Sequence, residues 1–313
     1  MLFRSFLGNA PWSVPSLRAL ASSRHRVKVA VTRVPRPAGR GGRLTPTAVA
    51  AAARELGLPV VEAAAAREGA GLEAIAAAAP DVLAVVAYGE ILPPDVLRIP
   101  RIAPVNVHFS LLPALRGAAP VQRAILWGHE RTGVTTIEMD AGMDTGPILL
   151  QRETSIEPDE DAGALGARLA SMGAGLLVET LDALAAGTVD PTPQEDSLAT
   201  YAPRITSDDE RIDWSRPAEE IVRQVRALSP EPGAWTTFRG MRVKVLAARS
   251  HGGFGWTSYP PKPGRITIGD DGQLIVHAGD GRAVHLDAVA PAGRRRMTGA
   301  EFARGNRPEA FDA

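Results

Sequence analysis

Apolar runs alternate with amphipathic stretches over roughly the first 190 residues of the chain. The run 81–89, DVLAVVAYG, is apolar almost throughout, which is typical of a strand covered on both faces. The same pattern predicts further strands at 2–8, 27–32, 58–63, 101–108 and 133–139, and helices at 14–23, 46–57, 68–79, 118–128 and about 160–186. Strands and helices that alternate in this way predict the α/β class, with a doubly wound, mostly parallel sheet.

The pattern changes after the long helix. Residues 188–203, TVDPTPQEDSLATYAP, lose the periodicity and gain proline and polar residues, as a linker does. A helix at 217–229 and short strands joined by Gly/Asp turns follow, and their size and number suit a small β-barrel of the oligonucleotide-binding type. We therefore expect a first domain over 1–188, a linker over 189–206 and a second domain over 207–313.

Composition excludes several classes of site. The 313 residues include no cysteine, which rules out disulfides, thiolate zinc sites and a cysteine nucleophile. The six histidines are scattered, so we expect no metal. No uninterrupted apolar stretch reaches the roughly 18 residues of a membrane span, and we expect no membrane partner. The acid-free N-terminus resembles an organelle transit peptide, but LFRSFLG predicts a first strand, which favours a cytoplasmic protein.

Charge is balanced overall but unevenly distributed. Residues 1–54 carry ten Lys or Arg and no acid, and residues 211–313 carry sixteen basic residues against eleven acids. This asymmetry favours a partner with its own charge pattern, such as nucleic acid. Alternatively, the basic and acidic segments meet each other in the fold.

Candidate chemistry lies where two of the predicted strands end. Asn106 and His108 are two residues apart at the end of one strand, so their side chains share a face. Asp144 follows another strand in the glycine-containing segment 139–146, MDAGMDTG. An imidazole beside a carboxylate and an amide donor suits transfer of an acyl-type group to a nucleophile on the substrate. The alternative is a capping Asn beside a buried core His.

Together these residues resemble a known family. The segment NVHFSLLPALRGAAPVQRAILWGHERTGVTTIEMDAGMDTGPIL closely resembles the catalytic core of the folate-dependent formyltransferases. RPAGRGGRLTP, VVAYGEILP, YAPRIT, RIDWSRPAEEI and GRRRMTGAEFARG narrow the resemblance to members that act on an aminoacylated tRNA. The resemblance implies a Rossmann-like formyltransferase domain and a tRNA-binding barrel. It also implies formyl transfer from 10-formyltetrahydrofolate to the amino group of a charged initiator tRNA, for translation initiation.

The resemblance also assigns residues. It implies that Asn106, His108 and Asp144 are the catalytic trio and that Ser110, Leu111, Leu112 and Pro113 contact the folate. The implied tRNA contacts are Arg33, Arg36, Arg40, Arg43, Lys244, Arg294, Arg295 and Arg296, with Arg40 the foremost of them. We expect a monomer that needs no metal.

Two rival functions stay open at this point. One is formyl transfer to a small-molecule amine, such as a nucleotide sugar or a glycinamide ribotide; the arginine-rich loop and the basic C-terminal domain weigh against it. The other is a non-catalytic RNA-binding protein on this fold, against which the intact trio counts.

Overall fold

The chain forms two compact units in the computed structural model, which describes residues 1–38, 43–251 and 262–312. The first unit comprises 1–120, 131–155 and 166–202, and the second comprises 121–130, 156–165 and 203–313. Each unit has its own hydrophobic core.

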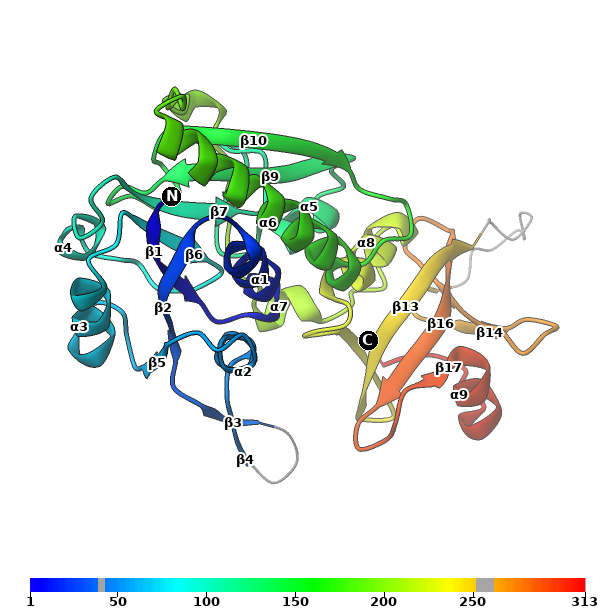
Figure 1. Cartoon of the computed structure of the whole chain (residues 1–313). Helices are drawn as coiled ribbons and strands as arrows, with labels where there is room; N and C mark the ends of the chain where they lie inside the picture. Colours follow the sequence, from blue (N-terminus) through cyan, green and yellow to red (C-terminus); the bar gives the residue numbers. More distant parts are fainter. Residues whose placement is uncertain (39–42, 252–261, 313) are drawn as a thin grey trace. The chain divides into compact units, whose positions relative to one another are not determined.

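The described residues of the first unit build a seven-stranded sheet in the order β10-β9-β7-β6-β1-β2-β5. The five strands β7, β6, β1, β2 and β5 are parallel to one another. At the other end of the sheet β9 pairs antiparallel with β7, and β10 pairs antiparallel with β9 (Figure 1). The strands are β1 (Phe3–Gly8), β2 (Arg26–Arg33), β5 (Val60–Ala63), β6 (Val82–Val86), β7 (Ala103–His108), β9 (Arg131–Glu138) and β10 (Ile148–Ser155). The predicted doubly wound, mostly parallel sheet is confirmed.

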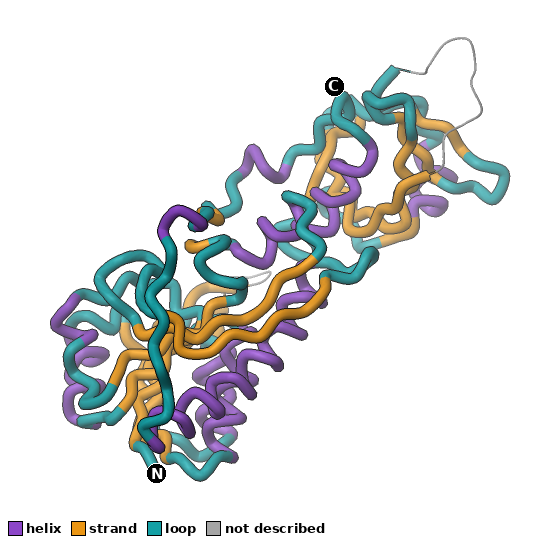
Figure 2. Tube along the Cα trace, turned by 90° about the horizontal axis from the view of Figure 1, so that it is seen from above, coloured by secondary structure: helices purple, strands orange, loops and turns teal. Residues whose placement is uncertain are grey.

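Helices lie on both sides of these strands (Figure 2). They are α1 (Val14–Ser22), α2 (Ala48–Glu55), α3 (Gly69–Ala78), α4 (Pro94–Leu97) and α6 (Ala162–Ala186). β6 is buried at every position, as its continuous apolar run predicts. Its residues Leu83 and Val85 pack with Ile75 of α3 and Val96 of α4 in one core cluster.

The long helix α6 packs against the sheet. Gly173 lies against Val107 and Val134, and the hydroxyl of Thr180 is 2.8 Å from that of Thr136. By length and composition α6 could also cross a membrane, a feature that inspection of the sequence overlooked. Its contacts with β7 and β9 are those of a helix that covers a sheet.

The second unit is β-rich, as the sequence predicts, and its strands pair antiparallel. Helix α8 (Ala218–Leu228) buries Ile221, Val225 and Leu228 against the inward side chains of its sheet. The strands are β12 (Ala234–Phe238), β13 (Met241–His251), β14 (Ile266–Ile268), β15 (Leu274–His277), β16 (Ala283–Pro291) and β17 (Met297–Thr298). The remaining helices are α5 (Pro120–Leu126), α7 (Ser207–Glu210) and α9 (Gly299–Asn306).

Short elements extend from the first unit. The strands β3 (Arg36–Ala38) and β4 (Arg43–Thr45) form a hairpin. Within the predicted linker, the turn η2 (Asp196–Leu198) precedes β11 (Tyr201–Ala202), which pairs in parallel with β8 (Arg116–Gly117). The first part of the predicted linker therefore belongs to the first unit and has defined contacts with it.

Candidate active site

Asn106, His108 and Asp144 come together at the carboxyl end of β7. The amide of Asn106 donates to Asp144 Oδ1 across 3.3 Å, and His108 Nδ1 lies 3.6 Å from Asp144 Oδ2. His108 is buried and Asp144 is 17% exposed at its side chain. The structure thus brings together all three residues that the sequence singles out.

The fold explains this meeting. Asn106 and His108 lie on the same face of β7, and β7 pairs with β9, whose chain leads directly into the loop that carries Asp144. Asp144 has a φ of +57°, in the left-handed region that Asp tolerates better than most residues. Gly146 lets the loop turn back, because a Cβ there would lie 1.8 Å from the carbonyl oxygen of Glu138.

Both ring nitrogens of His108 face oxygen acceptors. Nε2 lies 2.9 Å from the carbonyl oxygen of Leu115, and Nδ1 faces Asp144. The Asp144 carboxylate also accepts the backbone N–H of Gly117 across 2.9 Å. A protonated His108 could donate to both of its neighbours, so the site can hold a positive imidazolium beside a carboxylate.

The expected folate loop is only partly open. Ser110 and Leu112 are buried, whereas Leu111 and Pro113 are half-buried. Ser110 Oγ donates to the carbonyl oxygen of Ala114 across 2.6 Å. The apolar surface that this loop offers therefore comes from Leu111 and Pro113.

Two polar residues that the sequence did not single out reinforce the site. The side-chain amide of Gln194 donates to the carbonyl oxygens of Asp144 and Gly146 across 2.8 and 2.7 Å. Its own oxygen accepts from Nε of Arg116 across 3.0 Å, and the Arg116 side chain is 2% exposed. For Arg116, the Arg-Gly pair 116–117 just after the expected folate loop could have indicated a residue of the site. For Gln194 the sequence holds no such signal, because it lies in the aperiodic segment 188–203.

The first candidate tRNA residue, Arg33, is engaged within the unit. Its guanidinium lies 3.4 Å from the Glu90 carboxylate and 5.7 Å from the ring centre of Tyr88. Burial, together with the charge of Glu90, raises the pKa of Tyr88 to about 12. The positive charge of Arg33 is thus partly neutralised by the Glu90 carboxylate of the same chain.

The other candidates near Arg33 are Arg36, Arg40 and Arg43. Arg36 is exposed on β3. Arg40 lies outside the described residues, and the side chain of Arg43 does too.

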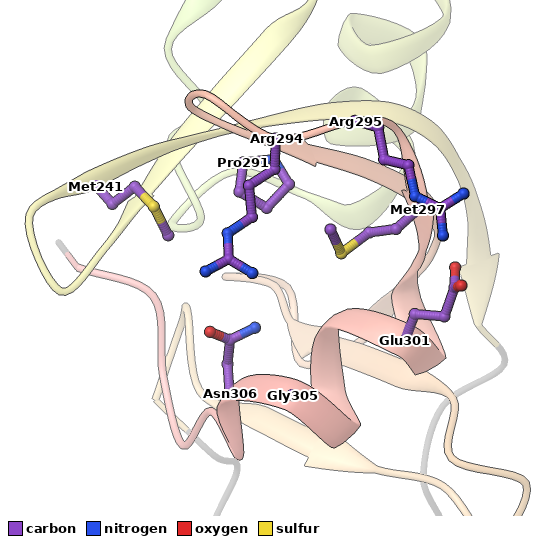
Figure 3. Close-up of a pocket in the computed structure, with 8 residues that line it drawn as sticks. All are labelled: Met241, Pro291, Arg294, Arg295, Met297, Glu301, Gly305 and Asn306. Carbon is purple, nitrogen blue, oxygen red and sulfur yellow. The ribbon is translucent and has the colours of Figure 1, made fainter.

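The C-terminal candidates lie on the second unit. Lys244 is on β13, 3.5 Å from the Glu231 carboxylate. Arg294, Arg295 and Arg296 are exposed on the turn between β16 and β17. Arg294 and Arg295 line a cavity of about 270 Å³, and Arg294 points across it toward Asn306 (Figure 3). The remaining lining residues are Met241, Pro291, Met297, Glu301 and Gly305.

In the ranges that the structure describes, His, Cys, Asp and Glu residues form no group of three or more that could hold an ion. That the chemistry needs no metal stays a prediction.

Solved structures share this fold at low sequence identity. The N-formyltransferase from Helicobacter canadensis, solved with folinic acid and dTDP-3-aminofucose, matches with a TM-score of 0.67 and 18% identity over 91% of this chain and 99% of its own. The methionyl-tRNA formyltransferase from Clostridium thermocellum matches with a TM-score of 0.57 and 16% identity over 80% of this chain and 93% of its own. At these identities the likeness concerns the fold alone.

Sequence comparison is more specific. The formyl transferase family model matches residues 5–181, and the formyl transferase C-terminal domain model matches residues 204–307. A methionyl-tRNA formyltransferase of Halorhodospira halophila (strain DSM 244 / SL1) is 45% identical over 96% of both chains, and one of Pseudomonas paraeruginosa (strain DSM 24068 / PA7) is 41% identical over 97% of this chain and 96% of its own. The resemblance inferred from the motifs is thereby confirmed, and the chain belongs to the methionyl-tRNA formyltransferase family.

Proposed function

We propose that this chain transfers the formyl group of 10-formyltetrahydrofolate to the α-amino group of initiator methionyl-tRNA, which supplies formylmethionyl-tRNA for translation initiation. The observation that carries the proposal is the identity of 41 to 45% with methionyl-tRNA formyltransferases over nearly the whole chain. The trio at the end of β7 supplies groups suited to this reaction. The proposed catalyst is a cytoplasmic monomer.

In the proposed reaction, the amine nitrogen attacks the formyl carbon, and the bond from that carbon to the folate nitrogen then breaks. Asn106 and protonated His108 stabilise the oxyanion that develops on the formyl oxygen. The geometry supports this role for Asn106, because its amide has a second N–H beyond the one directed at Asp144.

Proton transfer completes the reaction. His108 gives a proton to the leaving folate nitrogen, and Asp144 orients His108 and helps to remove the proton from the attacking amine. The burial of His108 supports this assignment, because a water-poor site strengthens the attraction between imidazolium and carboxylate. Neither a metal nor a covalent intermediate is part of the proposal.

Substrate contacts are proposed from the same chain. Ser110 to Pro113 contact the folate, with Leu111 and Pro113 supplying the accessible apolar surface. Arg33, Arg36, Arg40, Arg43, Lys244 and Arg294 to Arg296 contact tRNA. We also propose the division into a catalytic domain 1–188, a linker 189–206 and a tRNA-binding domain 207–313.

Competing acceptors test the proposal. With 10-formyltetrahydrofolate as donor, we expect rapid formylation of initiator methionyl-tRNA and little formylation of free methionine, glycinamide ribotide or a dTDP-linked amino sugar. Preferential formylation of the amino sugar would replace the tRNA assignment with a small-molecule one. Binding of tRNA without transfer to any of these acceptors would favour a non-catalytic RNA-binding protein.

A further inference from the structure

Asp144 holds a backbone conformation that needs support. Its φ of +57° is uncommon for a residue other than glycine, yet its carboxylate must meet Asn106, His108 and the Gly117 amide together. The carboxylate contacts fix the tip of the side chain. They leave the peptide groups of the loop to be held by something else.

Gln194 holds those peptide groups. Its nitrogen is 2.8 Å from the carbonyl oxygen of Asp144 and 2.7 Å from that of Gly146. Both N–H bonds of the amide are therefore directed at the loop on either side of Thr145. A single side chain thus spans the segment that begins with the catalytic carboxylate.

Arg116 fixes which way the Gln194 amide points. A guanidinium has donors only, so the group that faces Arg116 Nε at 3.0 Å must be the oxygen of Gln194. The nitrogen is then left to face the two carbonyls. Arg116 itself is almost fully buried and also donates to Asp196 across 2.8 Å.

Arg116, Gly117, Gln194 and Asp144 form a closed network of hydrogen bonds. Gly117, next to Arg116, donates its N–H to the Asp144 carboxylate, while Arg116 acts through Gln194 on the Asp144 backbone. The same residues, 116 and 117, form β8, which pairs with β11. The short strand β8 therefore holds Asp144 in two ways: Gly117 by a direct hydrogen bond, and Arg116 through Gln194.

We propose that Gln194 is a positioning residue, which holds the Asp144 loop in the conformation that presents the carboxylate to Asn106 and His108. Gln194 donates two hydrogen bonds to the loop and touches no reacting atom. The kinetic part of this proposal rests on the proposed role of Asp144. The conformational part does not.

The decisive variants are Gln194→Ala and Gln194→Glu. Glutamate has nearly the same shape but only acceptors, so it fills the space, faces two carbonyls with a carboxylate and loses both hydrogen bonds. Because a misplacement of about 1 Å can cost on the order of 100-fold in rate, we expect kcat to fall between about 10-fold and 100-fold in both variants. The KM values for folate and tRNA should stay within about twofold, since the substrate contacts are unchanged.

Ser197→Ala is the matched control, because Ser197 is an exposed residue of the same segment whose hydroxyl donates to Glu195. It should retain full activity. In an Asp144→Asn background, Gln194→Ala should cost little more, because two residues that act as one unit are not additive. A wild-type kcat in Gln194→Glu, or fully additive losses, would overturn the positioning role.

Hydrogen exchange tests the proposal without any activity assay. The Gly117 amide, which donates to Asp144, should exchange faster in Gln194→Glu than in wild type, with an unchanged melting temperature. Unchanged exchange at Gly117 would show that the loop does not depend on Gln194. Inactivity of the wild type with methionyl-tRNA would instead count against the proposed function, and the exchange result would stand by itself.

Discussion

The carboxyl end of β7 and the turn 294–296 differ in how firmly they hold their polar side chains. Asp144 has defined partners for both carboxylate oxygens and for its backbone carbonyl, and its neighbour His108 is buried. Arg294, Arg295 and Arg296 are exposed side chains on a turn of the second unit. Chemistry requires atoms fixed to fractions of an ångström, whereas attraction of a polyanion requires charge that phosphates can reach. Changes in the first region should therefore alter the rate of the chemical step, and changes in the second should alter tRNA affinity.

The largest effect should come from the trio. General acid–base groups contribute roughly 10²–10⁴-fold in rate, so His108→Ala should lower kcat by a factor in that range while folate and tRNA still bind. His129→Ala is the matched control, because His129 is exposed and belongs to the second unit, and it should keep full activity. Steady-state formylation assays measure both. A His108→Ala variant with more than about a tenth of wild-type activity would contradict the assigned role.

A slightly smaller loss should follow from a change that leaves the trio intact. In Gly146→Ala the new Cβ would meet the carbonyl oxygen of Glu138, so the loop must shift and carry Asp144 with it. We expect kcat to fall by about 100-fold, with a lowered melting temperature.

Gly175→Ala is the comparison for that variant. A Cβ at Gly175 meets nothing within 4 Å, and the position lies within α6, where Ala is favoured over Gly by about 1 kcal/mol. This variant should be fully active and at least as stable as wild type. Equal activity in both glycine variants would show that the Asp144 loop tolerates displacement.

The arginine turn should change binding and not the chemical step. Each phosphate contact contributes about 0.7 to 0.9 to the slope of log affinity against log salt. Replacing Arg294, Arg295 and Arg296 together by Ala should therefore flatten the slope for tRNA by up to about 2 to 3 and leave folate affinity unchanged. Arg131→Ala, which removes an exposed arginine paired with Glu153, should leave the slope as it is. An unchanged slope in the triple variant would remove this turn from the tRNA surface.

The smallest effect concerns His25 and Leu2, which directly precede β2 and β1 at the amino ends of these parallel strands. His25 accepts the backbone N–H of Leu2 at Nδ1 and faces Asp182 with Nε2. Burial, aided by the charge of Arg4, lowers the pKa of His25 below its ordinary value of 6.5, although the hydrogen bond to Asp182 opposes the shift. Below about pH 6.5 the unfolded chain then binds more protons than the folded one at this residue. This contribution to stability is present above that pH and is lost as the pH falls through the window between the two pKa values.

Thermal melts between about pH 8 and pH 5 test this sign. The wild type should lose more stability on acidification than His25→Gln, which cannot titrate in that range. The pH dependence is measured on stability and not on kcat, so it reports on folding alone. A steeper loss in His25→Gln would contradict the direction of the shift.

Several elements follow directly from the sequence. The apolar run of β6 and the amphipathic pattern of α6 predict both elements. A strand buried on both faces has a continuous run of apolar residues, whereas a helix buried on one face has apolar residues that recur about every 3.6 positions. The strand β10 was not predicted. It lies at the edge of the sheet, and most of its residues from Gln151 onward are exposed, so selection for apolar residues is weak there.

The site divides in the same way. Asn106, His108 and Asp144 could be identified from the sequence, because side chains converge at the carboxyl ends of parallel strands and the sequence shows where these strands end. Gln194 could not, because its partners are backbone carbonyls about 50 residues away in the chain, and carbonyls carry no sequence signal. Arg33 shows the converse limit, since it ends β2 whereas Glu90 lies in the loop after β6, and the two side chains meet only in the fold.

The rate of the chemical step at saturation tests the separation of chemistry from tRNA capture most directly. Single-turnover formylation, with 10-formyltetrahydrofolate and methionyl-tRNA both saturating, should be measured for wild type, Asp144→Asn and the triple Arg294, Arg295 and Arg296 to Ala variant. We expect a rate lowered by about 10²-fold or more in Asp144→Asn and a near wild-type rate in the triple variant, which should only need more tRNA to reach it. A near wild-type rate in Asp144→Asn, or an equal loss in the arginine variant at saturation, would contradict this separation.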